Sequence, residues 1–159
     1  MPSSKKPRKP FNAAKHQVMS IMFALADHEK AKLKQDPRVA LEAMRTGDGS
    51  LILWRTMAVR LNVLTHVVTH GAKDWHEVSR NAGLAMKSAH ERFDRTGKWG
   101  FSGPEYDAVR LALNTMDDAQ DQMTRVELYH AYRAAEKGRD IARKAGTIFV
   151  DTFNYLATA

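Results

Sequence analysis

The histidines of the stretch LTHVVTHGAKDWHEV are the residues whose spacing comes closest to a chemical site. His66 and His70 stand four residues apart, so on a helix both side chains share one face, as in a two-histidine metal site. The zinc-protease pattern needs a glutamate directly after the first histidine, and Val67 stands there instead. A third ligand such as His76 lies beyond Gly71. We therefore expect no metal and no cofactor, and interpret His66 and His70 as histidines near a helix end, where imidazolium complements the helix dipole.

Three aspartates, Asp117, Asp118 and Asp121, form a second group with chemical potential. Paired carboxylates can transfer protons or hold Mg²⁺. Asp117 and Asp121 are four residues apart on a predicted helix, where like charges repel. We interpret the group as a solvated acidic face. Because the titratable candidates are scattered along the chain, we expect a non-enzymatic protein with no catalytic residue.

The N-terminal stretch MPSSKKPRKP is basic and rich in proline. The chain carries a net charge of +7, and this stretch supplies four of the positive charges, on Lys5, Lys6, Arg8 and Lys9. The remaining residues hold 21 basic and 18 acidic groups, so the body is only mildly basic. Prolines and like charges together predict a disordered tail over residues 1–11. Such a tail is suited to reach phosphates or to assist the encounter with a protein.

A second basic cluster lies near the C-terminus, on Arg133, Lys137, Arg139, Arg143 and Lys144. With the tail it makes nucleic-acid binding the alternative function. Glu136 and Asp140 dilute the cluster, and no helix-turn-helix, zinc-finger or aromatic base-stacking pattern accompanies it.

Two aromatic residues, Trp99 and Phe101, flank a glycine in a predicted connection between helices. If they are exposed, they are anchors of the kind that dominate binding energy at protein interfaces. If they are buried, they close one end of the helical bundle. The leading functional hypothesis places the protein-binding contact on these two residues.

Hydrophobic periodicity predicts the elements that position these groups. Apolar residues recur at helical spacing and do not alternate as in strands, which predicts an all-α compact bundle of five to seven helices. The helices are expected at about 13–28, from Asp36-Pro37 to Gly47, and at about 51–70, 74–96, 103–123 and 124–144. We expect one helical domain over residues 12–159.

Composition narrows the function classes further. The chain has no cysteine, which excludes disulfide scaffolds, Cys-ligated zinc and thiol catalysis and fits a reducing cytoplasm. No stretch reaches the eighteen or so apolar residues that a membrane span needs, so we expect no membrane-spanning helix. The segment from Val18 to Ala26 imitates a signal peptide, but Val18, Ile21, Met22 and Leu25 fall at helical spacing, and we interpret it as an amphipathic first helix.

Several turn and cap residues carry a resemblance to a known group. They are Arg92, Thr96-Gly97-Lys98-Trp99, Glu105, Leu111-Ala112-Leu113-Asn114, Asp118-Ala119-Gln120 and Thr124, together with the Lys-Lys-Pro-Arg-Lys-Pro tail. This pattern resembles small uncharacterised basic helical proteins of phage and prophage genomes, over about residues 1–10 and 50–130. The resemblance implies an accessory protein in the cytoplasm of a bacterial host. The function expected of it is binding of a host or phage protein, as an inhibitor of a host factor for example, with homo-oligomers as a further possibility.

Overall fold

The computed structural model describes residues 27–70 and 73–144, and every regular element in these residues is a helix. The elements, in chain order, are α2 (Asp27–Thr46), α3 (Leu51–His70), the short 3-10 helix η1 (Lys73–Trp75), α4 (His76–Thr96), α5 (Gly103–Gln122) and α6 (Arg125–Lys144). Five α-helices lie at the lower edge of the expected range, and the all-helical prediction is confirmed for this part of the chain. The predicted tail over residues 1–11 lies outside it.

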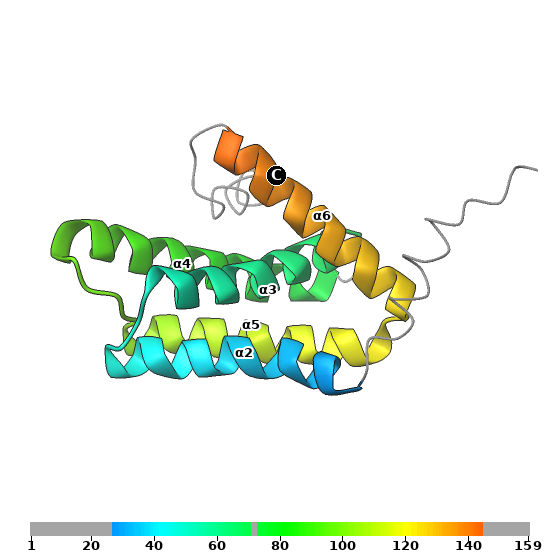
Figure 1. Ribbon diagram of the computed structural model, residues 1–159, viewed down its shortest axis with the longest axis horizontal. Coiled ribbons are helices and arrows are strands. Elements are labelled where there is room, and N and C mark those ends of the chain that lie inside the picture. The colour runs from blue at the N-terminus through cyan, green and yellow to red at the C-terminus, as the bar shows by residue number, and fades with distance from the viewer. Residues whose placement is uncertain (1–26, 71–72, 145–159) are drawn as a thin grey trace, which may run out of the picture.

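The helices α2 to α5 form an antiparallel bundle, and α6 crosses it. In Figure 1, α2 and α5 lie side by side below α3 and α4, while α6 runs diagonally across the upper layer. Short connections make successive helices antiparallel neighbours. The central element is α3, which packs against α2, α4, α5 and α6. Its side chains dominate the core, as its wide apolar face predicts, with Trp54, Met57, Leu61 and Leu64 almost completely buried.

The expectation that no stretch reaches the length of a membrane span is wrong by length and composition, because Leu51–Thr69 of α3 is long and apolar enough to cross a membrane. Length and composition are weak evidence, because the core helix of a globular protein passes the same test. In this structure the indole of Trp54 lies inside the bundle, where its Nε1 donates to the carbonyl oxygen of Met86 on α4 at 3.1 Å.

The start of α2 differs from the prediction. The dipeptide Asp36-Pro37 predicted a helix start, but α2 begins at Asp27 and Pro37 lies inside it. Proline has no N–H, so the hydrogen bond to the carbonyl of Leu33 is missing. Pro37 is itself buried, and the turns that follow it bury Ala40, Leu41 and Met44 in the core. This burial offsets the lost bond and keeps the helix continuous.

The connection between α4 and α5 forms as its sequence signals predict. Gly97 ends α4 with a positive φ of 68°, and its N–H donates to the carbonyl of Phe93 at 2.7 Å. Ser102 and Glu105 form the predicted capping box of α5, in which the N–H of Ser102 donates to Glu105 Oε2 at 2.7 Å. Arg92 fastens the two helices together, because it donates to Glu105 Oε1 at 2.6 Å and to the carbonyl of Gly100 at 2.7 Å.

The carboxyl of Glu105 has a strongly lowered pKa as a result. Burial raises its pKa, but hydrogen bonds from Arg92, from the N–H and hydroxyl of Ser102 and from Ser88 outweigh burial and bring the pKa to about 2. The ionised carboxylate is therefore the form that holds α4 and α5 together.

Candidate functional site

A buried arginine lies in the middle of the most apolar helix. Arg60 on α3 is only 2% exposed. One terminal nitrogen donates to Asp117 Oδ1 on α5 at 2.9 Å, and the other donates to the hydroxyl of Tyr132 on α6 at 2.7 Å. Its Nε is buried without a hydrogen-bond partner. A charge at this depth is costly unless it is paired, so Arg60 depends on the carboxylate that faces it.

Asp117 is shared between two arginines. Its second oxygen, Oδ2, accepts from Nε of Arg38 at 3.2 Å and from a terminal nitrogen of Arg38 at 2.6 Å. That terminal nitrogen also donates to Asn114 Oδ1 at 2.8 Å. The cluster thereby joins α2, α3 and α5, and Tyr132 adds α6. Asp117 belongs to this charge network, so the interpretation of Asp117 as a solvated residue is wrong, whereas Asp118 and Asp121 are exposed as expected.

The hydroxyl of Tyr132 is held in its protonated form. Burial raises the pKa of Tyr132, and the nearby positive charge of Arg60 offsets only part of that rise. A tyrosine with a raised pKa is no base at neutral pH. The charged groups of the cluster, Arg38, Arg60 and Asp117, bind one another, and Tyr132 binds Arg60. The cluster therefore joins four helices and serves the stability of the fold.

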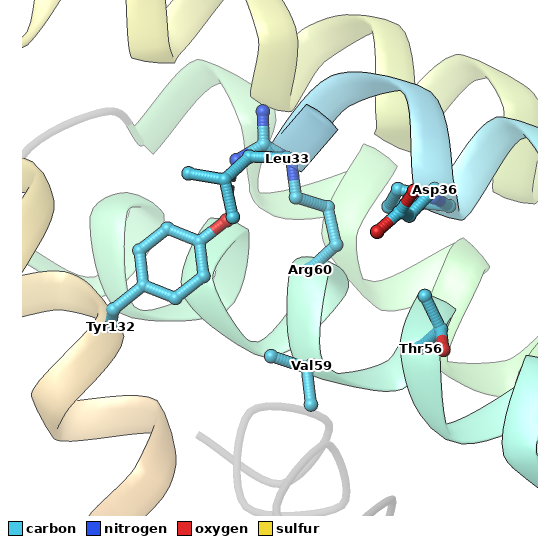
Figure 2. A pocket seen from close by; sticks show the side chains of 7 residues that line it. Leu33, Asp36, Thr56, Val59, Arg60 and Tyr132 are labelled. Carbon is cyan, nitrogen blue, oxygen red and sulfur yellow. Dashed lines mark hydrogen bonds between the residues drawn. The ribbon is translucent and has the colours of Figure 1, made fainter. Parts of the chain in front are cut away.

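A hollow lies beside this cluster, between α2 and α3. Its volume is about 210 Å³, and Figure 2 shows side chains from α2, α3 and α6 around it. The residues that line it are Leu33, Asp36, Pro37, Thr56, Val59, Arg60 and Tyr132. Drug-sized ligands occupy pockets of roughly 300–1,000 Å³. This hollow is smaller and has mainly apolar walls, which suits one or two apolar side chains of a polypeptide.

Exposed aliphatic side chains extend the hollow along both helices. Ile52, Thr56 and Val59 follow one another at a spacing of four and three residues, so they share one side of α3. On α2, Val39 lies three residues after Asp36. Ile52 is 75% exposed and Val39 is 58% exposed. We call the hollow together with Val39 and Ile52 the α2–α3 groove.

One carboxylate, that of Asp36, lies in the groove. Asp36 is exposed, and within the described part of the chain it makes no ion pair. Glu42, another acidic residue of α2, pairs with Arg45 at 2.7 Å. The groove therefore combines apolar walls with the exposed carboxylate of Asp36, while the guanidinium of Arg60 in its wall is buried and paired with Asp117. That combination favours an occupant that is apolar and carries a positive charge.

The predicted protein-binding residues lie around the connection between α4 and α5, and neither of them lines the hollow. Trp99 is only 8% exposed. Its ring stacks on Phe93 at 4.4 Å between centroids and meets the edge of His90 at 5.5 Å. Phe101 is partly buried against the same core. Of the two arrangements left open by the sequence, Trp99 adopts the one that closes the end of the bundle.

The histidines do not form a metal site in the part of the chain that the structure describes. His66 is half-buried on α3, and the side chain of His70 lies outside the described residues. Across residues 27–70 and 73–144, no three His, Asp or Glu side chains are grouped so that they could hold a metal ion. Binding of metal by His66 and His70 stays a hypothesis.

The basic cluster on α6 is only partly visible. Arg133 pairs with Glu136 on its own helix at 3.0 Å, and Lys137 and Lys144 are exposed. The side chains of Arg139 and Arg143 lie outside the described residues, as do Lys5, Lys6, Arg8 and Lys9 of the tail. Of the basic residues of this cluster, the structure therefore describes the side chains of Arg133, Lys137 and Lys144.

Sequence reasoning missed the groove and the charge cluster beside it. One signal was present, since Arg60 is a charged residue in the middle of a helix predicted to be central. A charge at such a position requires a buried partner. Which residue supplies that partner depends on packing, because Asp117 lies 57 positions further along the chain.

No family model, no curated protein and no solved structure matches the chain.

Proposed function

We propose that the chain is a non-enzymatic protein that acts by binding another protein at the α2–α3 groove. The observation that carries this proposal is the exposure of Ile52, a large aliphatic side chain left 75% exposed beside an apolar hollow. Exposed apolar surface next to a groove is typical of protein-binding sites. The burial of Trp99 moves the proposed contact from the α4–α5 connection to this groove.

The size of the groove indicates what kind of partner segment fits. An amphipathic helix binds a groove through apolar side chains at positions i, i+3, i+4 and i+7. The hollow accepts one or two of the partner's apolar side chains. The remaining apolar side chains of the partner helix would pack against Val39 and Ile52 at the border of the hollow. Full burial of an isoleucine side chain contributes about 2 kcal/mol, which corresponds to roughly 30-fold in affinity.

The non-enzymatic part of the proposal is supported by how the acidic groups are used. Asp117 is engaged by Arg38 and Arg60, and Glu105 is engaged by Arg92. These pairs join helices to one another, and Arg60, which also lines the hollow, is already engaged by Asp117. The resemblance to phage and prophage proteins directs the search for the partner to host bacterial and phage proteins, with inhibition of a host factor in the cytoplasm as the proposed outcome.

The test compares two aspartate substitutions at equally apolar, exposed positions. Ile52→Asp places a charge in the groove, and Leu111→Asp places one on α5, where Leu111 is 54% exposed. Full-length protein with each change is used as bait in lysates of phage-infected and uninfected bacteria, and captured proteins are quantified by mass spectrometry. We expect a partner that is retained by wild type and by L111D and reduced at least tenfold with I52D, in line with the loss of one buried isoleucine. Equal capture by all three proteins would refute the groove as the contact.

Nucleic-acid binding is the alternative, favoured by the exposed Lys137 and Lys144 on α6 and by the charge of the tail. It predicts that a labelled duplex or single strand binds the full chain at near-physiological salt and that a chain lacking residues 1–10 loses most of that affinity. Four to eight phosphate contacts give a log–log salt slope of roughly −4 to −7. Fluorescence anisotropy at several salt concentrations measures both quantities.

A further inference from the structure

The charges beside the α2–α3 groove are unevenly available to a partner. Two of the residues that line the hollow carry a charge, Asp36 and Arg60. Arg60 is buried, and its terminal nitrogens already bind Asp117 and Tyr132. Asp36 is exposed, so its carboxylate is the charge that an incoming side chain meets.

The basic residues of α2 leave this carboxylate unpaired. Lys34 and Arg38 pair with carboxylates of α5 at 2.7 Å and 2.6 Å. Lys32 lies one helical turn before Asp36, and the two make no ion pair in the part of the chain that the structure describes. A positive charge on a partner can therefore pair with Asp36 without displacing a basic residue of this protein.

Asp36 lies between two apolar parts of the groove. In Figure 2 it stands at the opposite end of the hollow from Leu33 and Tyr132. Along α2, Leu33 precedes Asp36 by three residues and Val39 follows it by three, so each lies about 4.5 Å from it along the helix axis. The apolar end of the hollow and the exposed border are therefore about 9 Å apart on α2, with the carboxylate midway.

The α3 side of the groove has a similar spacing. Val59 lines the hollow, and Ile52 lies seven residues earlier on α3, which is about 10.5 Å along the axis. In a partner helix that lies along α3, two apolar side chains seven residues apart span the same distance. One of them then enters the hollow, and the other packs against Ile52 and Val39.

We propose that the partner segment is a basic amphipathic helix, with apolar residues at positions i and i+7 and a lysine or arginine at i+3 or i+4 that pairs with Asp36. Positions i+3 and i+4 share the helical face of i and i+7 and lie about 4.5–6 Å from the first apolar residue, which is the level of the carboxylate. The aliphatic stem of a lysine or arginine also covers apolar surface while its charged end reaches the carboxylate. This inference rests on the proposed function, because it concerns the same groove.

Selection from a peptide library tests this chemistry without knowledge of the natural partner. The library displays helical peptides with leucine fixed at i and i+7 and every residue type allowed at i+3 and i+4. The baits are the full-length protein and its variants D36N, D36K and D118N. Asp118 is the matched control, since it is an exposed aspartate of α5 that does not line the hollow. Circular dichroism checks that each variant keeps its helices.

We expect wild type and D118N to select lysine or arginine at i+3 or i+4, D36N to select neither charge, and D36K to select glutamate or aspartate. For a peptide selected on wild type, D36N should weaken binding about two- to fivefold, the range for an exposed ion pair. Replacing the basic residue of the peptide with glutamate should weaken its binding to wild type and strengthen its binding to D36K. Such a reversal assigns the contact to Asp36.

The variant I52D separates this inference from the proposed function. Peptides that lose at least about tenfold in affinity with I52D but show no preference for a basic residue would overturn the inference and leave the groove as the contact. A basic preference that is the same for wild type and D36K would also overturn it, since another carboxylate would then be the partner. Selection of no peptide, or of peptides that bind I52D as tightly as wild type, would refute the groove as the contact and this inference with it.

Discussion

Replacing Glu105 with glutamine should destabilise the protein in a way that depends on pH. The carboxylate joins α5 to α4 through Arg92 and caps α5 through Ser102. Glutamine keeps the size of the side chain but has no charge. The difference between wild type and E105Q therefore reports the free energy that the ionised carboxylate contributes to the folded state.

The lowered pKa of Glu105 sets the magnitude and the direction of the effect. The pKa falls from 4.5 to about 2 on folding, and one unit corresponds to about 1.4 kcal/mol, so the charged form stabilises the fold by about 3 kcal/mol. A lowered folded-state pKa means that this stabilisation is complete well above pH 4.5 and is lost as the pH falls toward 2. At pH 3 about 2 kcal/mol of it is already lost.

Urea unfolding followed by circular dichroism at pH 7, 5, 4 and 3 measures this dependence. We expect the loss of unfolding free energy in E105Q to be largest at pH 7 and to shrink steadily below pH 4.5. Glu136→Gln is the control, because Glu136 pairs with Arg133 at the surface and such pairs contribute less than about 1 kcal/mol. A deficit in E105Q that is the same at pH 7 and pH 3 would refute the reasoning.

Three further substitutions probe the interior. Asp117→Asn leaves Arg60 buried without a counter-charge and should lower the unfolding free energy by about 3–5 kcal/mol in urea titrations; a loss below 1 kcal/mol would show that Arg60 is solvated. Gly49→Ala places a Cβ 2.5 Å from Met44 Sδ and 2.6 Å from Trp99 Cβ. This overpacking should lower the free energy of unfolding by about 1–3 kcal/mol. Unchanged thermal stability would mean that the loop around Gly49 moves to accommodate the methyl group. Trp99→Ala should lower the free energy of unfolding by about 3–5 kcal/mol, because Trp99 is a buried aromatic residue. A variant with wild-type stability would indicate that Trp99 is an exposed binding residue.

Features encoded over a few adjacent residues could be predicted from the sequence. The restart at Ser102 with Glu105 three positions later, and the break at Thr124 with Glu127 three positions later, both appear in the structure as helix starts. Gly97 ends α4 because the left-handed backbone that terminates a helix is easy for glycine. Each of these depends on contacts within one turn, so the local sequence carries the information.

Features that depend on packing could not be predicted in the same way. Asp36-Pro37 is a strong local signal for a helix start. The helix nevertheless continues through Pro37, because Pro37 and the residues after it on α2 are buried against the core. Asp117 has the local character of an exposed acid, and only the arrangement of α2, α3 and α5 brings Arg38 and Arg60 to it. Leu51 is an apolar residue of the central helix α3 and yet is 38% exposed, because burial depends on which side of the helix its neighbours cover.

The attachment of α6 has a consequence for how the molecule opens. Within the described part of the chain, α6 packs substantially on α3 alone, whereas α2 and α4 each contact two other α-helices of the bundle and α5 contacts three. Its buried anchors are few, chiefly Leu128, Ala131 and Ala135. A helix held on one side is the first cooperative unit to detach in sub-global unfolding. Amide hydrogens of α6 should therefore exchange with solvent ahead of those of α3, and each such opening takes the Tyr132 hydroxyl away from Arg60 and lets water reach the guanidinium.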